Sequence, residues 1–132
     1  MTQTLDQQRA AFAWSAAEEG MNRHHDSYRQ LAKGAPALIM TSGLMPVLAF
    51  YRGKDAAHQK LLEDLMRVIS VELWPQELGA AGQASAFTPF MKKLQGCDSQ
   101  TYRRATESAL ETLKWIRQFV DAVEHARGGG AR

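Results

Sequence analysis

Apolar side chains recur at every third or fourth position along most of the chain, which is the spacing of one face of an α-helix. The longest such stripe lies at about residues 100–126. Its apolar positions are Tyr102, Ala105, Ala109, Leu113, Ile116, Val120 and Val123. No run of four or more β-branched or aromatic residues alternates with polar residues as a strand would. The pattern predicts an all-α fold: a compact single-domain helical bundle with a long C-terminal helix.

Glycine and proline residues divide the first half of the chain into several predicted helices. These helices cover about residues 5–19, 24–33, 36–41 and 44–52. Gly20 and Gly34 are expected to end the first two, and Pro36 to begin the third, because its fixed φ is already helical. The Thr41-Ser42-Gly43 sequence should then break the path, with Ser42 as the N-cap of the fourth helix.

The second half of the chain carries similar signals. Asp55 is placed to cap a helix over about residues 55–73, and Pro75 should end that helix at Trp74. The apolar face of this helix comprises Leu61, Leu62, Leu65, Met66, Ile69 and Leu73. A mobile loop over residues 79–86 and a short helix over about 88–94 are predicted to follow.

The last helix is expected to be capped by Asp98 or Ser99. Residues 128–132, Gly-Gly-Gly-Ala-Arg, have no means of burying apolar area. We therefore expect residues 1–127 to form one helical domain and residues 128–132 a flexible tail.

Composition agrees with one domain held together by packing. With 132 residues and 45% apolar content, the chain can bury a single core without disulfides or metal. Cys97 is the only cysteine, and its neighbours Gly96 and Asp98 do not favour a reactive thiol, so we interpret it as structural. The N-terminal residues do not resemble a signal sequence, and no window approaches the ~20 apolar residues that span a bilayer. A cytoplasmic location is expected.

Charged residues are unevenly distributed, although the net charge is only +2. Residues 23–54 contain five basic side chains and one acidic, residues 55–77 two basic and five acidic, and residues 92–117 six basic and three acidic. Two basic surfaces can follow a phosphate backbone, while an acidic helix can face a protein partner. A mixed surface that serves only solubility is the alternative interpretation.

No combination of residues predicts a catalytic or metal site, and no cofactor is expected. His24 and His25 are adjacent on a predicted helix, where neighbouring side chains diverge by about 100° and cannot easily share an ion. A di-iron bundle needs two Glu-x-x-His motifs, whereas Asp55 and His58 supply one approximate match. The Glu63-Asp64 pair is expected on the outer side of its helix, away from the leucines. We therefore expect no enzyme activity.

Three segments together resemble a known family in their order and spacing. Residues 7–10 read Gln-Gln-Arg-Ala, residues 36–39 read Pro-Ala-Leu-Ile before Gly43-Leu44, and residues 102–122 form the third segment. On these residues the chain resembles the small α-helical subunit of the type III-B CRISPR Cmr RNA-silencing complex, over most of its length. Ser42, where this family often carries Asn, and Pro46 in the next helix are mild departures.

The resemblance implies a non-catalytic subunit with a role in antiviral defence. Several copies would stack beside a guide-bound backbone of ferredoxin-like subunits. They would line the channel in which target RNA pairs with guide RNA, and support cleavage by another subunit.

Basic side chains are the predicted RNA contacts, because target sequences vary and only the phosphates are constant. The hypothetical set is Arg29, Lys33, Arg52, Lys54, Lys92, Lys93, Arg103 and Arg104. As an alternative, Arg103 and Arg104 pair with Glu107 on the solvated side of their helix.

Aromatic residues outside the predicted core stripes are the expected contacts with neighbouring subunits, because aromatic anchors dominate interfaces. They are Trp14, Phe87 and Phe90. Core placement is the alternative for each, and Trp115 could flank the core or lie in a subunit contact.

Two other functions fit a small helical domain. One is a stand-alone adaptor that binds a protein and never meets RNA. The other is the small subunit of the related type III-A complex, although the pattern over residues 36–50 favours type III-B. Copy number and the division of contacts between guide and target RNA are not determined by the sequence.

Overall fold

The computed structural model describes residues 2–78 and 86–127, and within these ranges every regular element is an α-helix. The helices are α1 (Leu5–Ser42), α2 (Leu44–Arg52), α3 (Ala56–Leu73), α4 (Pro75–Leu78), α5 (Phe87–Gly96) and α6 (Ser99–Ala126). The predicted all-α fold with a long C-terminal helix is therefore confirmed. The predicted tail and most of the predicted loop at residues 79–86 lie outside the described residues.

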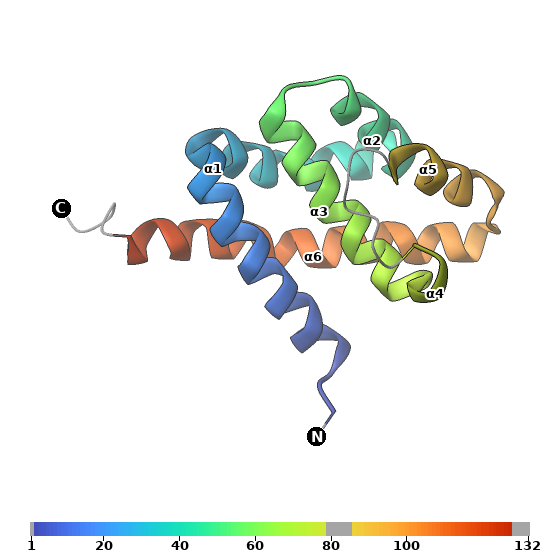
Figure 1. Ribbon diagram of the computed structural model, residues 1–132, viewed down its shortest axis with the longest axis horizontal. Helices are drawn as coiled ribbons and strands as arrows, with labels where there is room; N and C mark the ends of the chain where they lie inside the picture. The colour runs from blue at the N-terminus through green and yellow to red at the C-terminus, as the bar shows by residue number, and fades with distance from the viewer. Residues whose placement is uncertain (1, 79–85, 128–132) are drawn as a thin grey trace.

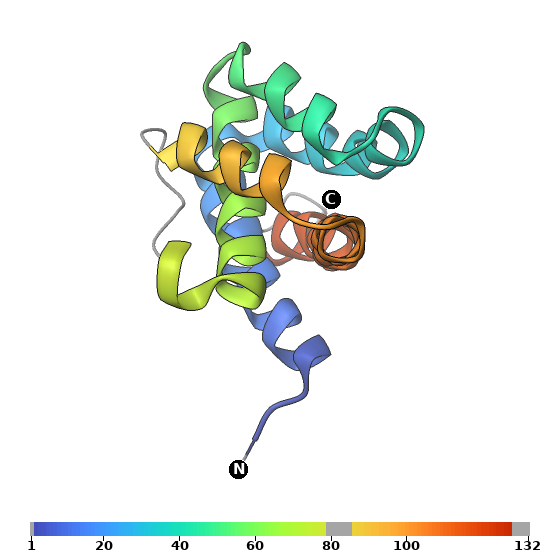
Figure 2. The same ribbon diagram turned by 90° about the vertical axis from the view of Figure 1, so that its right-hand side faces the viewer.

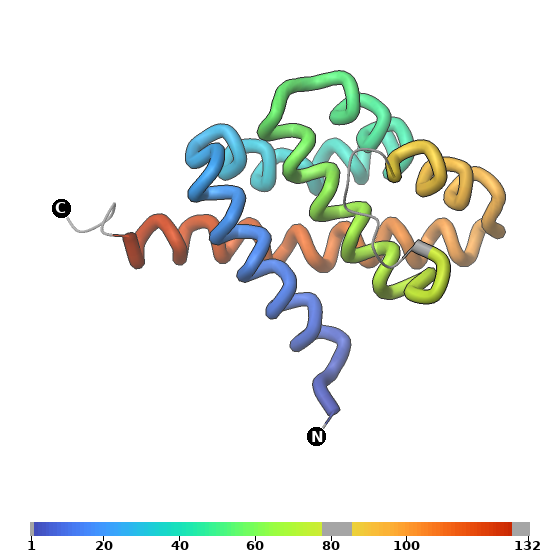
Figure 3. The backbone as a smooth tube through the Cα atoms, viewed as in Figure 1, coloured from blue at the N-terminus to red at the C-terminus, as the bar shows by residue number. Residues whose placement is uncertain are grey.

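Helix α6 is the axis of the bundle, and the other long helices pack against it (Figure 1). Helix α1 is sharply bent, so that its first arm crosses α6 and its second arm runs alongside it (Figure 3). Helix α3 contacts both α1 and α6. Helices α2 and α5 lie at the end of the molecule where α6 begins, and this end faces the viewer in Figure 2.

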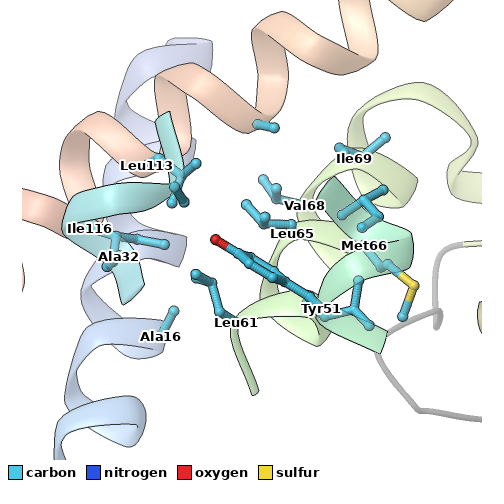
Figure 4. Packing of buried hydrophobic residues seen from close by; sticks show 14 of the residues in the cluster. Ala16, Ala32, Tyr51, Leu61, Leu65, Met66, Val68, Ile69, Leu113 and Ile116 are labelled. Carbon is cyan, nitrogen blue, oxygen red and sulfur yellow. The ribbon is translucent and has the colours of Figure 1, made fainter. Parts of the chain in front are cut away.

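The core forms where these helices meet, and it uses the predicted apolar stripes. Six of the seven predicted apolar positions of α6 are buried, and Tyr102 is half-buried. Tyr51 of α2 points toward the space between Leu61 and Leu65 of α3 and Ile116 of α6 (Figure 4). The periodicity therefore predicted correctly which faces of α3 and α6 are turned inward.

The three helices predicted between residues 5 and 41 form one bent helix, α1, with two arms. The predicted break between the first two helices exists, but it lies at His25 and not at Gly20, and Gly34 and Pro36 are not helix boundaries. Gly20 is buried, and a Cβ atom there would overlap the ring of Tyr28. Gly34 faces open space. The helix continues through these weak positions because its buried residues, from Ala13 to Ile39, pack against the core.

The bend in α1 occurs at His25, where φ is 41° and ψ is −115°. Positive φ is unusual for a residue other than glycine, and this combination resembles the first central position of a type II′ turn. The imidazole Nε2 of His25 lies 2.7 Å from a carboxylate oxygen of Glu124 in α6. The bend is therefore strained locally and held by a contact with a distant helix.

A buried polar network joins both arms of α1 to α3. The hydroxyl of Tyr28 donates to Asp64 at 2.7 Å, and the ammonium of Lys60 donates to both oxygens of Asp64, at 2.6 and 2.8 Å. Lys60 also lies 3.4 Å from a carboxylate oxygen of Glu19 in the first arm. Burial raises the pKa of Asp64, and the charge and hydrogen bonds of Lys60 oppose this rise. The expectation that Glu63-Asp64 lies on the outer side of its helix is thus wrong for Asp64, which is 5% exposed.

The helix caps agree with the sequence in two of three cases. Asp55 accepts a hydrogen bond from the backbone N–H of His58, and Asp98 accepts one from that of Thr101. Ser42, however, does not cap α2, whose N-cap is Gly43 with φ 95°. The Tyr102 hydroxyl of α6 instead accepts the backbone N–H of Met45 at 3.0 Å. The hydroxyl of Tyr102 therefore accepts a backbone N–H in the first turn of α2, which is the role predicted for the side chain of Ser42.

We predict opposite effects of alanine at two glycines of α1. Gly20→Ala should lower the free energy of unfolding by about 1–3 kcal/mol, because the added methyl group overlaps the ring of Tyr28, which is buried and bonded to Asp64. Gly34→Ala should raise it by about 0.5–1 kcal/mol, because the site is open and helical. Urea unfolding of both variants measures this. A Gly20→Ala variant as stable as the wild type would show that Tyr28 does not pack on Gly20.

A second prediction concerns the strain at His25. His25→Gly should raise the free energy of unfolding by about 1 kcal/mol, because glycine adopts this conformation without steric penalty. The exposed contact with Glu124 is worth less than this strain. His24→Gly is the matched control and should be destabilising, because the positive φ belongs to its neighbour. Equal destabilisation of both variants would contradict a strained bend.

Candidate nucleic-acid interface

The eight basic residues predicted to contact RNA fall into two groups in the structure. Arg29, Lys33 and Lys93 each form an ion pair with an acidic side chain of the same chain. Within the described ranges, the other five have no carboxylate within 4.0 Å. These five, called the free cations below, are Arg52, Lys54, Lys92, Arg103 and Arg104. A ligand can bind this second group without first displacing a paired carboxylate.

Asp121 of α6 compensates two of the paired residues. Its carboxylate accepts from Nζ of Lys33 at 2.7 Å and from Nε of Arg29 at 3.0 Å. The hydrogen bond from Lys33, and then that from Arg29, lower the pKa of Asp121. The carboxylate is therefore ionised near neutral pH and reduces the positive field of the α1–α6 edge.

Four of the free cations lie on α5, the first turns of α6 and the end of α2, and Lys54 follows α2; these helices gather at one end of the bundle (Figure 2). Arg52 donates to the side-chain oxygen of Gln59 at 3.3 Å, and its guanidinium lies 5.4 Å from the centre of the Phe87 ring. The ammonium of Lys54, on the turn after α2, is 4.7 Å from the centre of the Phe50 ring. Contacts of this kind leave the positive charges accessible while reducing the freedom of their side chains.

Arg103 and Arg104 are exposed on α6. Neither forms an ion pair with Glu107 in the part of the chain that the structure describes. The alternative in which Glu107 neutralises them is therefore not supported.

The three predicted interface aromatics differ in exposure. Trp14 is 37% exposed and packs edge-to-face on Phe119, with ring centres 5.2 Å apart. Phe87 is half-buried beneath Arg52. Phe90 is fully buried, so its prediction as an exposed contact residue is wrong. It shares the inner face of α5 with Leu94, one turn away, and this short stripe was too brief to recognise.

Trp115 flanks the core, which is one of the two positions predicted for it. It is half-buried, and its indole N–H donates to Asp6 at 3.1 Å. Its ring centre lies 5.6 Å from that of Phe119. Trp14, Phe119 and Trp115 thus form one aromatic row between α1 and α6.

Two shallow depressions lie beside the first turns of α6, and sequence reasoning did not identify either. One, of about 410 Å³, is lined by Trp74, Lys92, Lys93, Cys97, Asp98 and Thr101, and is called the Trp74 depression below. The other, of about 270 Å³, is lined by Leu5, Arg9, Val71, Glu72, Arg104 and Glu107. Arg9 and Glu72 form a two-bonded ion pair on its wall, with both distances 2.9 Å.

Three of the four residues considered for metal binding have structural partners, whereas the buried Nε2 of His24 has no hydrogen-bond partner among the described residues. His25 contacts Glu124 at the bend, and Nδ1 of His58 lies 2.7 Å from the capping carboxylate of Asp55. Among the described residues, no three His, Cys, Asp or Glu side chains gather as a metal site would require. The thiol of Cys97 is half-buried and donates to the carbonyl of Leu94 at 3.2 Å. None of the described helices has the length and apolar content needed to cross a membrane.

Comparison with known proteins gives one family. The family model described as CRISPR-associated protein (Cas_Cmr5) matches residues 5–123. This range includes every described helix except the last turn of α6. None of the curated proteins compared with the chain matches it.

The ion pairs of Asp121 give a pH-dependent prediction. Because the folded state lowers its pKa, Asp121 stabilises the fold above its ordinary pKa of 3.8, and this contribution is lost as the pH falls through the folded value. Asp121→Asn should therefore lower the free energy of unfolding at neutral pH, by less than about 1 kcal/mol because the site is half exposed.

Urea unfolding of the wild type and the Asp121→Asn variant from neutral pH down to about pH 2 measures the effect. The difference between the two proteins should disappear at the acidic end. A difference that is independent of pH would show that the ion pairs of Asp121 do not form in solution.

Proposed function

Because the chain belongs to the CRISPR-associated Cas_Cmr5 family, and is thereby a small subunit of the type III-B Cmr complex, we propose that its free cations bind RNA within that complex. Association with other Cmr subunits follows from the family. The assignment decides against both the stand-alone adaptor and the type III-A subunit.

The grouping of the free cations supports this proposal. Phosphates are the constant feature of RNA, and uncompensated Lys and Arg side chains bind them without reading the bases. The five such predicted residues lie on neighbouring elements at one end of the bundle. Arg29 and Lys33, which are paired with Asp121, contribute less, because a phosphate must first displace that carboxylate.

The proposed function also includes the side-by-side packing of several copies of the chain and the absence of catalysis by this subunit. Several copies of the chain lie side by side in the cytoplasmic complex, next to its backbone subunits, and contact both guide and target RNA. Trp14 is the best candidate for a contact with a neighbouring subunit, because it is the most exposed of the predicted aromatics. RNA cleavage belongs to another subunit, and the purified chain should leave RNA intact.

The test is the double variant Arg103→Glu, Arg104→Glu in a reconstituted, guide-loaded complex. We expect weaker binding of every target RNA, with a salt dependence reduced by about one unit for each phosphate that the variant no longer binds. The affinity is measured across a salt titration. A complex without this chain defines the largest possible effect.

Lys114→Gln is the matched control for this experiment. Lys114 is exposed on the same helix, but it is paired with Glu111 at 2.9 Å and lies outside the predicted set. Its substitution should leave the salt dependence unchanged. If the arginine variant assembles fully and binds like the control, Arg103 and Arg104 do not contact RNA.

A further inference from the structure

Trp74 is held rigidly at the junction of two helices. Pro75 disfavours the helical conformation at Trp74, whose φ is −138° and ψ 55°. Its backbone N–H donates to Ser70 at 2.9 Å, and its carbonyl accepts from Glu77 at 3.2 Å. The ring meets the buried Phe90 edge-to-face, with centres 6.2 Å apart. The half-buried indole therefore has a fixed orientation at the surface.

Two lysines line the same depression as Trp74. Nζ of Lys93 lies 5.9 Å from the centre of the Trp74 ring and 2.8 Å from a carboxylate oxygen of Glu77. Lys92, one of the free cations, lines the same Trp74 depression. An aromatic ring and two cations thus converge on one depression, and of these two cations Lys93 is the one paired with a carboxylate. Asp98 also lines the depression, where it accepts a backbone N–H as the N-cap of α6.

The second depression, next along α6, carries both signs of charge: Arg9 is paired with Glu72 on its wall, and Glu107 lines it together with Arg104. Thr101 lines the Trp74 depression, whereas Arg104 lies three residues later on α6. Residues three apart on a helix lie on the same face. Leu73 borders the second depression and Trp74 the first, so the two are adjacent at the end of α3 as well. Arg104, which forms no ion pair among the described residues, is therefore the cation of the second depression that lies next along α6.

From this arrangement, and building on the proposed function, we infer that Trp74 stacks an unpaired base of the bound RNA while Lys92 and Lys93 contact its phosphates. Every base has a flat face that an indole can cover, so stacking is compatible with variable sequences. A phosphate near Lys93 replaces the carboxylate of Glu77, and that carboxylate is released to solvent. Arg104 then contacts the next part of the strand.

Fluorescence of residue 74 tests the inference directly. The chain is produced with 7-azatryptophan, so that its emission is distinguished from that of tryptophans in the other subunits. It is assembled into the guide-loaded complex with and without Trp74→Phe, and the difference between the two is the emission of residue 74. Adding single-stranded RNA should change this emission. The corresponding difference for Trp115→Phe, which pairs with Asp6, should not respond.

Binding measurements accompany the spectra. Trp74→Leu should weaken RNA affinity about fivefold or more, whereas Trp74→Phe, which keeps an aromatic face, should weaken it less. Glu77→Gln removes the competitor of the phosphate at Lys93 and should strengthen binding at low salt. Because Trp74 also contacts Phe90, co-assembly of each variant is checked first.

The outcomes separate this inference from the proposed function. In one outcome, Arg103→Glu, Arg104→Glu weakens RNA binding, Trp74→Leu does not, and the emission of residue 74 does not change when RNA is added. That outcome overturns stacking on Trp74 and leaves the proposed function intact. If neither substitution has an effect, both fail. If Trp74→Leu prevents co-assembly and RNA leaves the emission unchanged, Trp74 is a protein contact and the inference is wrong.

Discussion

The packing of Tyr28 on Gly20 is the contact on which the arrangement of the other helices depends. A straight helix of 38 residues would extend about 57 Å, beyond the roughly 42 Å of α6, and could not place both halves on one core. The bend at His25 returns the second arm to α6, and the hydroxyl of Tyr28 then reaches Asp64 in α3. Only glycine at position 20 leaves room for this ring.

The network around Asp64 specifies this bend more than it stabilises the fold. Burial raises the pKa of Asp64, which means that desolvation opposes its ionised form, and Lys60 offsets only part of this effect. Buried ion pairs are often no more stabilising than apolar residues of similar size. Their geometric demands are strict, however, because Lys60 reaches both Asp64 and Glu19 only when the first arm lies in its observed position. We therefore interpret the network as fixing the position of α1 relative to α3.

Local signals in the sequence were reliable where the structure uses local interactions. The stripes of α3 and α6 and the caps Asp55 and Asp98 depend on residues within one or two turns. Gly20 and Pro36 misled, because tertiary packing outweighs helix propensity in α1. The partners of the basic residues were equally inaccessible, since Asp121 is about ninety positions from Arg29 and Lys33. Composition identifies the basic residues, but only the folded chain determines which of them are paired with a carboxylate.

Pairing of only some basic residues with carboxylates suits the proposed role, in which the subunit binds RNA without selecting its sequence. Exposed charges attract phosphates at a distance, but salt screens them within about 10 Å at ordinary ionic strength. Stacking on a fixed ring is much less sensitive to salt, yet it acts only on contact. In the binding event that we propose, the free cations and Trp74 therefore supply different parts: the cations guide the strand to the end of the bundle, and the ring retains a base once it arrives. Neither part reads sequence, which leaves specificity to pairing with the guide.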